Sequence, residues 1–342
     1  MLRSLACVLL LATAAPAKDP AAYPEPPKAA PDEPVAKAWS PAKAAAYLDA
    51  VGVNWTRDRA CVTCHTNLPY LMARPLLEGS DAGVKEVRAF LEGEATAWRQ
   101  GKNKRAPAYY VATAAGLAFT DAGTGKLSAE TRAAFDKVWE SQKPTGEWDW
   151  IKCDWPPLEH DDYYGAVLAA VAVGVAPERY ALSDAARPGV AKLKAYLAKT
   201  PAPDLHHRAM LLWAAARLDG LLTADQKAEI VAELRKKQRA DGGWCLPALG
   251  RYVRKDQSAN DPDAASDGYA TGFAVYALRQ AGVPAQDDAA KKGIGWLKGN
   301  QRESGRWFTR SLNTDKRHYI ANAGTAFAVM ALAACGEPVA GK

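Results

Sequence analysis

The sequence lacks the features of a β-protein, of a membrane-spanning protein and of a nucleic-acid-binding protein. Runs that alternate apolar and polar residues, which are typical of strands, are nearly absent. No stretch beyond the N-terminus is apolar enough to span a bilayer. The net charge is only +6, and no block of lysine and arginine with interleaved aromatic residues occurs. We therefore expect a helical protein of 342 residues that neither spans a membrane nor binds nucleic acid.

Cysteine is also scarce, and the N-terminus determines how many of the 6 cysteines stay in the mature protein. Arg3 followed by an apolar run over residues 5–11 and a small-residue cleavage site ending at Ala17 is typical of a secretory signal peptide, residues 1–17. Its removal would take Cys7 away and leave an odd number of cysteines in an oxidising, periplasmic or extracellular compartment. An odd number argues against a framework built of disulfides alone.

The remaining chain divides into a linker, one domain and a short tail. Residues 18–40 are rich in proline, alanine and charge, a composition that predicts an extended linker rather than part of a core. Residues 41–336 have the balance of apolar and charged residues of a globular domain, and residues 337–342 are a tail.

Three segments of the domain share one spacing of residues. They read VWESQKPTGEW, LRKKQRADGGW and LKGNQRESGRW, and they end at Trp148, Trp244 and Trp307. In each, an apolar residue precedes glutamine by four positions, glycine follows the glutamine by four, and tryptophan follows the glycine by two. The spacing predicts a helix that ends near the glutamine, a tight exit at the glycine and a tryptophan that folds back onto the helix.

These segments are QW motifs, and over roughly residues 41–336 the chain resembles the squalene–hopene cyclase and prenyltransferase-repeat superfamily. The third copy is the fullest, because KGIGWLKGNQRESGRW also contains the Lys-Gly and Trp-Leu pairs that precede the glutamine in that family. The resemblance implies an all-α fold, an α/α toroid of about six helical hairpins, with inner helices around a cavity and outer helices outside them. It also implies that the QW residues are structural and not catalytic.

Segments rich in small residues are expected to form the inner helices, since alanine and glycine permit close packing. Three of them follow the motifs, two more have no clear motif before them, and a sixth candidate lies near residue 70. The expected inner helices are 68–77, 109–119, 163–174, 208–218, 269–282 and 323–336.

All 5 histidines of the chain lie at the N-terminal ends of these expected helices. Since the inner helices of a toroid run in the same direction, we expect the histidines to surround one mouth of the cavity. The positive end of a helix dipole disfavours imidazolium, which leaves neutral imidazoles that can bind a metal. The candidate metal ligands are His65, His160, His206, His207 and His318.

Three aspartates at the same helix ends are candidate catalytic residues: Asp161, Asp162 and Asp267. Asp161 and Asp162 follow His160 and could orient its imidazole through the second ring nitrogen, as carboxylates do beside metal ligands. Asp161 and Asp267 could equally be N-caps of their helices, as could Asp204.

The segment CVTCH, residues 61–65, resembles the haem-attachment motif of c-type cytochromes. That resemblance implies a haem c joined to Cys61 and Cys64 by thioethers, with His65 as the proximal iron ligand. Export favours it, because haem c is attached outside the cytoplasm. Two alternatives stay open: a Zn²⁺ or other transition-metal site that uses the thiolates and a mouth histidine, and a CxxC disulfide or no cofactor at all.

The chain departs from the chemistry of the family that it resembles. It has about half the length of a squalene–hopene cyclase, it has no DxDD acid motif, and the Asp-x-Cys pairing of the prenyltransferase zinc site is not evident. Three functions stay open. One is a haem- or metal-bearing oxidoreductase or electron-transfer protein with an electron-transfer partner. Another is a cyclase or transferase for an apolar or isoprenoid small molecule, whose inner-helix aromatic residues would line a cavity unless they simply pack. The third is a non-catalytic toroid that binds a ligand or a protein.

Overall fold

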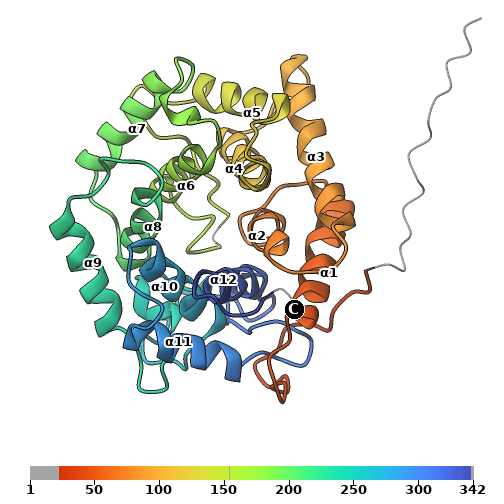
Figure 1. The fold of residues 1–342 in the computed structure, drawn as a ribbon, viewed down its shortest axis with the longest axis vertical. Coiled ribbons are helices and arrows are strands. Elements are labelled where there is room, and N and C mark those ends of the chain that lie inside the picture. The colour runs from red at the N-terminus through yellow and green to blue at the C-terminus, as the bar shows by residue number, and fades with distance from the viewer. Residues whose placement is uncertain (1–22, 154, 340–342) are drawn as a thin grey trace, which may run out of the picture.

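The helices of the protein form two concentric rings (Figure 1). The computed structural model describes residues 23–153 and 155–339, so the predicted signal peptide, residues 1–17, lies outside the described residues. The described residues contain twelve α-helices and no strand. The outer helices are α1 (Pro41–Arg59), α3 (Ala82–Arg99), α5 (Ala129–Glu140), α7 (Arg187–Lys199), α9 (Ala224–Lys236) and α11 (Asp288–Gly299). The inner helices are α2 (Asn67–Ala73), α4 (Pro107–Thr124), α6 (Asp162–Val175), α8 (Leu205–Ala215), α10 (Gly268–Gln280) and α12 (Ile320–Ala334).

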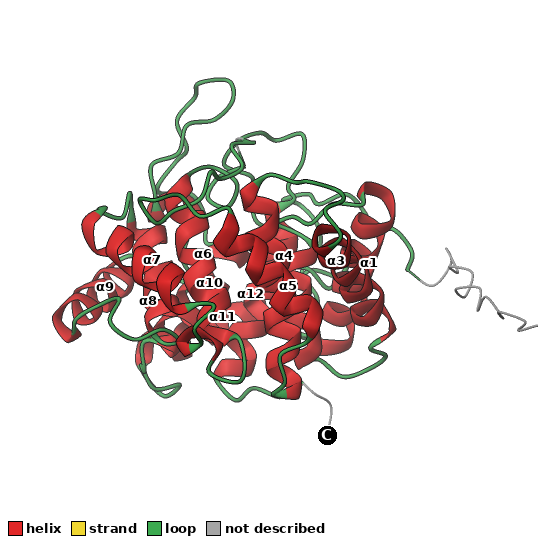
Figure 2. Cartoon of the chain, turned by 90° about the horizontal axis from the view of Figure 1, so that it is seen from above, coloured by secondary structure: helices red, strands yellow, loops and turns green. Residues whose placement is uncertain are grey.

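The predicted α/α toroid of six hairpins is confirmed. Each inner helix packs against the next one along the chain, and α12 closes the ring by packing against α2 as well as α10. Three short 3₁₀ helices lie in the connections: η2 (Arg74–Leu76), η3 (Tyr180–Leu182) and η4 (Leu246–Leu249). The longer loops, which lead from an outer to an inner helix, gather at one end of the rings (Figure 2). Within the described residues, no helix combines the length and the apolarity that crossing a membrane requires.

The small residues of the inner helices allow the close packing that the composition predicted. Gly272 of α10 lies so near α12 that a Cβ at this position would come within 2.5 Å of the Ala328 backbone nitrogen. Inner helices such as α6 and α12 are buried on nearly all sides, whereas α11 and the other outer helices bury one face. Polar side chains of the inner ring are therefore concentrated at helix ends, where backbone groups need partners.

A QW motif lies at the end of three outer helices, and its side chains hydrogen-bond that helix to the next outer helix. In all three, the tryptophan indole N–H donates to the carbonyl ten residues earlier, at 2.7 Å, and so satisfies one of the last carbonyls of its own helix. The glutamine amide donates both to the motif glycine and across to the next outer helix. Gln142 reaches the Gly189 carbonyl of α7 at 3.0 Å, and Gln238 reaches the Ala289 carbonyl of α11 at 2.9 Å.

The third motif makes the same connection across the ends of the chain. Gln301 donates to the Ser40 carbonyl at 3.0 Å and accepts from the Ser40 amide at 2.6 Å, just before α1 begins. Glu33, within the predicted linker, pairs with the buried Arg306 at 3.0 Å and accepts from the Ser304 amide. Residues 23–40 thus lie extended along the last hairpin and cover the seam where the ring closes.

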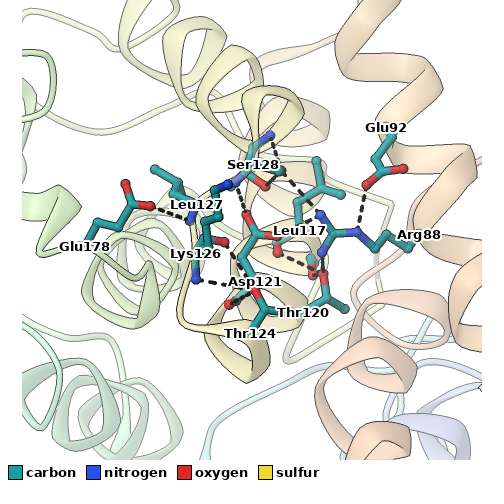
Figure 3. Close-up of polar contacts among 12 residues, drawn as sticks. Arg88, Glu92, Leu117, Thr120, Asp121, Thr124, Lys126, Leu127, Ser128 and Glu178 are labelled. Carbon is teal, nitrogen blue, oxygen red and sulfur yellow. Dashed lines mark hydrogen bonds and ion pairs between the residues drawn. The ribbon is translucent and has the colours of Figure 1, made fainter.

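A group of ion pairs and hydrogen bonds connects α3, α4 and α5 at the opposite end of the rings. The buried Asp121 carboxylate of α4 pairs with Arg88 of α3 at 2.7 Å and accepts from the Ser128 amide, which caps α5, also at 2.7 Å (Figure 3). Arg88 also pairs with Glu92, and together these contacts hold three helices at the C-terminal end of α4.

The close packing at the seam, where the last hairpin meets α1, predicts how an added methyl group would change stability. Gly305 has φ +90°, and a Cβ there would overlap the Lys43 carbonyl of α1. We expect Gly305→Ala to lower the free energy of unfolding by about 2–4 kcal/mol, through backbone strain and the loss of close packing. Urea unfolding followed by circular dichroism measures the change.

The matched control is Gly295→Ala, in the same hairpin. Gly295 lies within α11 and a Cβ there would meet nothing within 4 Å. Because alanine is the better helix former, this variant should be neutral or more stable by up to about 1 kcal/mol. Equal losses in both variants would show that the seam has no special importance.

Candidate functional site

The N-terminal ends of the inner helices meet at one mouth of the toroid, and aspartates cap three of them. Asp161, Asp204 and Asp267 are the N-caps of α6, α8 and α10, and each carboxylate accepts the amide hydrogen three residues on, at 2.9–3.0 Å. The capping interpretation therefore holds for all three. It leaves a second oxygen on each carboxylate for other contacts.

His207 uses two of these carboxylates at once. Its Nδ1 lies 2.7 Å from Asp204 Oδ1, and its Nε2 lies 3.0 Å from Asp161 Oδ2. The ring is buried between α6 and α8. Burial alone would lower the pKa of His207, but the two hydrogen bonds raise it to about 9. Burial would raise the pKa of Asp204, but the His207 contact lowers it to about 2. The carboxylate that we expected to hold His160 thus holds His207 instead.

His206 lies beside His207 but in apolar surroundings. Its side chain is 0% exposed, and Nε2 lies 2.8 Å from the Tyr269 hydroxyl of α10. Its Nδ1 atom is buried and has no hydrogen-bond partner. Burial lowers the pKa of His206 to about 3, so the ring is neutral in the folded protein. A buried, neutral nitrogen without a partner is costly unless something else occupies the space beside it.

Asp204, His206 and His207 together form a cluster of metal-ligand type. One ligating atom of each lies within 4.8 Å of those of the other two, and no second group of this kind was found among residues 23–153 and 155–339. With Nε2 of both rings engaged by Asp161 and Tyr269, Nδ1 of His206 is left without a partner, whereas Nδ1 of His207 is hydrogen-bonded to Asp204.

The absence of a side chain at Gly250 leaves room for Asp204 and Tyr252 beside this cluster. A Cβ on Gly250 would overlap both Asp204 Oδ2 and the ring of Tyr252. The Tyr252 hydroxyl is buried and lies close enough to the Asp204 carboxylate for that charge to disfavour loss of the phenol proton. Burial raises the pKa of Tyr252 well above its ordinary value, so the phenol keeps its proton.

The other three histidines lie at the mouth but outside this cluster. His160 is exposed, with its ring edge toward Tyr252 at 5.8 Å. His318 is half-buried, and its Nδ1 accepts from the Ser311 amide at 3.1 Å. His65 is buried and neutral, because burial lowers its pKa to about 3. The structure therefore brings His206 and His207 together and leaves His65, His160 and His318 apart from them.

The remaining candidate carboxylates, Asp162 and Asp267, accept hydrogen bonds from residues of the loops around them. Asp162 accepts from the Trp150 amide at 2.9 Å and lies 3.5 Å from Lys152. Asp267 accepts from the Leu246 amide at 2.6 Å and from the Thr309 hydroxyl at 3.1 Å. Burial raises the pKa of Asp267 to about 6, although these donors act in the opposite direction. Its oxygens are fully occupied in holding three segments together.

The CVTCH segment enters the mouth beneath the loop that precedes α6. Cys64 is 4% exposed, and its amide donates to the buried Glu159 carboxylate at 3.1 Å. Burial raises the pKa of both Cys61 and Cys64, which favours the thiols over the thiolates. The two sulfurs are not joined in a disulfide.

The surroundings of His65 bear on the predicted haem. Its Nδ1 lies 2.7 Å from the Thr66 hydroxyl, an arrangement that would suit an iron ligand. However, its ring stacks on Tyr319 at 5.1 Å, meets the edge of Trp55 at 4.9 Å and faces Trp155 at 6.4 Å. Aromatic packing around His65 and the burial of Cys64 do not fit a porphyrin plane at this position. Haem attachment stays a prediction, and we derive no step from it.

The axis of the toroid is filled by aromatic rings. Trp213 of α8 contacts Phe119 of α4 at 5.7 Å, Tyr276 of α10 at 5.3 Å and Phe327 of α12 at 5.9 Å. Tyr269 and Phe273 join the same group. At these positions the aromatic residues pack against one another between the inner helices.

Sequence reasoning missed three contributors to the mouth. Asp204 was considered only as a cap, although its place two residues before His206 puts it in the same helical turn. Glu159 and Tyr252 lie in loops that carry no repeat signal, so nothing in the sequence indicated that they would fold inward. Tyr269 is one of the inner-helix aromatic residues for which lining a cavity and simple packing both stayed open, and its hydroxyl contacts His206.

Comparisons with known proteins agree with this fold. Residues 210–320 match the family model of the squalene-hopene cyclase C-terminal domain, which supports the resemblance to squalene–hopene cyclase-like toroids. No curated protein matches the chain.

Solved structures show the same ring. The chain is similar to a glycosidase, with a TM-score of 0.53, 12% identity and coverage of 86% of this chain and 98% of that one. It is similar to a polysaccharide lyase, with a TM-score of 0.51, 10% identity and coverage of 85% and 96%. A type II terpene cyclase from Scytonema, in complex with merosterolic acid A, has a TM-score of 0.46, 17% identity and coverage of 78% and 86%. Likeness at such identities shows the fold alone.

The burial of His65 predicts an acid-sensitive stability. In the unfolded chain His65 takes up a proton below about pH 6.5, whereas in the folded protein it stays neutral down to about pH 3. Protonation therefore favours the unfolded chain, and the free energy of unfolding falls as the pH drops from about 6.5 toward 3. We expect His65→Phe to fall less steeply than the wild type in urea unfolding measured at pH 7, 5 and 4.

The control for this comparison is His160→Phe, which removes an exposed histidine from the same mouth. It should keep the full slope of the wild type. Identical slopes for wild type and His65→Phe would mean that the folded protein admits a proton to His65, and the packing described above would then be incorrect.

Proposed function

We propose that this protein is a metal-dependent enzyme whose active centre lies at the mouth of an α/α toroid, with a transition-metal ion held by Asp204, His206 and His207. One observation carries the proposal. The buried, unpartnered Nδ1 of His206 belongs to one cluster with the Asp204 carboxylate and His207, and Nε2 of each ring is held by an outer partner. Nδ1 of His207 is hydrogen-bonded to Asp204 in the metal-free protein and would exchange this contact for the ion.

The residue types suit the ion. Two imidazoles and one carboxylate are ligands for Zn²⁺ and related divalent transition metals, and three protein ligands leave coordination positions open for water or substrate. Asp161 and Tyr269 would orient the two rings, as hydrogen-bond partners of ligating histidines commonly do. When bound, the ion would supply Lewis acidity or an activated water.

The charges of the chain support a cation here. The positive end of the α8 dipole opposes a metal ion, but the Asp161 and Asp204 carboxylates offset it. Without a metal, a doubly protonated His207 supplies the positive charge between the same two carboxylates. The imidazolium thus keeps the ligands assembled in the metal-free protein.

Two further expectations belong to this proposal. The family match is consistent with an apolar or isoprenoid small molecule as substrate, and the mouth between the inner helices is where it would meet the cluster. The proposal also includes export of the protein, which depends on the predicted signal peptide. Tyr252 would stand next to the reacting groups, since its protonated phenol lies beside Asp204.

Metal analysis tests the proposal directly. We expect the purified protein, supplied with Zn²⁺ or Co²⁺ and then dialysed, to retain about one ion per chain, and the Co²⁺ form to show visible ligand-field absorption. Asp204→Asn, His206→Ala and His207→Ala should lose the ion. Asn preserves the α8 cap, so the Asp204 variant should fold. Asp161→Asn should weaken the affinity by roughly 10–100-fold, because it removes an orienting partner.

The control variants are His160→Ala and His318→Ala, which remove mouth histidines outside the cluster and should keep the ion. A wild-type protein that binds neither metal, or cluster variants that bind as well as the wild type, would overturn the proposal. Production in a host that matures c-type cytochromes tests haem on the same protein: added haem mass that is lost in Cys61→Ala with Cys64→Ala would establish it instead.

A further inference from the structure

A cavity lies at the seam of the ring, away from the cluster of Asp204, His206 and His207. It has a volume of about 380 Å³, within the range of small-molecule sites. Its walls are residues 25–29 of the N-terminal segment, the C-terminal half of α1 and the turn that leads into α12. Nothing in the proposed function uses this cavity.

Its apolar walls are aromatic rings, each accompanied by a guanidinium group. Arg306 lies 5.0 Å from the centre of the Tyr47 ring. In the same way, Arg59 lies 5.8 Å from Trp55, and Arg317 lies 5.8 Å from Tyr319. The three pairs surround one space, which combines apolar faces with fixed positive charge.

The side chains that line the cavity carry more positive than negative charges. Its lining contains five cationic side chains, Lys28, Arg59, Arg306, Lys316 and Arg317, against the carboxylates Glu25 and Asp58. Arg306 is 2% exposed and is used by Glu33. Within the described part of the chain, no carboxylate forms an ion pair with Arg59, Lys316 or Arg317. Arg317 donates one N–H to the Tyr319 hydroxyl at 3.0 Å. Its other N–H donors and those of Arg59 and Lys316 can turn toward a ligand.

We propose that this cavity binds an amphiphilic anion, a carboxylate or a phosphate monoester on an apolar chain. The head group would lie among Arg59, Lys316 and Arg317, where guanidinium groups bind carboxylate and phosphate oxygens in pairs. The apolar chain would lie against Trp55 and Tyr319, whose rings are only partly buried and so have area to cover. Carboxylates and phosphates share this chemistry, and the experiment below separates them.

The cavity is connected to the CVTCH segment by hydrogen bonds. The Tyr47 hydroxyl in its wall donates to Asn322 Oδ1 at 2.5 Å, and Asn322 Nδ2 donates to the Thr66 hydroxyl at 3.0 Å. Thr66 in turn contacts His65 at 2.7 Å. A ligand on Tyr47 and Tyr319 would therefore touch the residues that position His65, and it would bridge the first and last hairpins.

Calorimetric titration of the full protein tests the proposal with four probes: decanoate, decyl phosphate, decanol and inorganic phosphate, all below any micelle concentration. We expect the two amphiphilic anions to bind saturably, and decanol and inorganic phosphate to bind at least tenfold more weakly. Arg59→Gln with Lys316→Gln should weaken the binding of both anions at least tenfold. Whichever of decanoate and decyl phosphate binds more tightly identifies the head group.

The control removes the same charge elsewhere. Lys199→Gln with Lys236→Gln neutralises two exposed lysines on α7 and α9 and should leave binding unchanged. Equal affinity for decanol would overturn the anionic head group, equal affinity for inorganic phosphate would overturn the apolar part, and no binding by any probe would overturn both. Because Asp204, His206 and His207 do not line the cavity, EDTA-treated protein should give the same result, which separates this proposal from the metal centre.

Discussion

The hydrogen bonds from each motif glutamine to the next outer helix hold the hairpins of this protein together. A single helical hairpin cannot bury its apolar face, so it needs a neighbour on each side. Gln142 and Gln238 provide such links inside the chain, and Gln301 provides one between its ends, at Ser40. The accepting carbonyls lie at the start of the next outer helix, and the amide gives each of them a second hydrogen bond, so that every such contact strengthens the junction between two hairpins.

The ring determines where polar chemistry can occur. Inner helices that are buried on nearly all sides have no place for charged residues along their length. At their N-terminal ends, however, free amides attract carboxylates, and the carboxylates in turn attract imidazoles. Asp161 caps α6 with Oδ1 and contacts the His207 ring with Oδ2, whereas Asp204 uses Oδ1 both to cap α8 and to contact the same ring. A capping function and a ligand-positioning function thus coincide in the same side chains.

The sequence was sufficient for the fold, but not for the contacts that the polar side chains make at the mouth. Repeated spacing and small-residue helices predicted six hairpins, and a shared helix direction predicted that histidines would meet at one mouth. Which imidazole a carboxylate reaches depends on the rotation of each helix and on side-chain rotamers, and one sequence does not contain that information. Asp161 therefore faced His207 and not His160. The positions of Glu159 and Tyr252 depend on loops whose conformation is set by the completed ring.

The seam has a consequence for the assembly of the chain. Each hairpin can form from local contacts, but the junction of Gln301 with Ser40 joins residues 261 positions apart, so the ring closes only after its other junctions exist. Before that step the molecule is an open arc whose two ends are complementary to each other. The first hairpin of a second molecule presents the same surface to the last hairpin as the molecule's own. At high concentration, closure within one chain competes with exchange between chains, and the product of exchange is a domain-swapped dimer or a longer series of linked arcs.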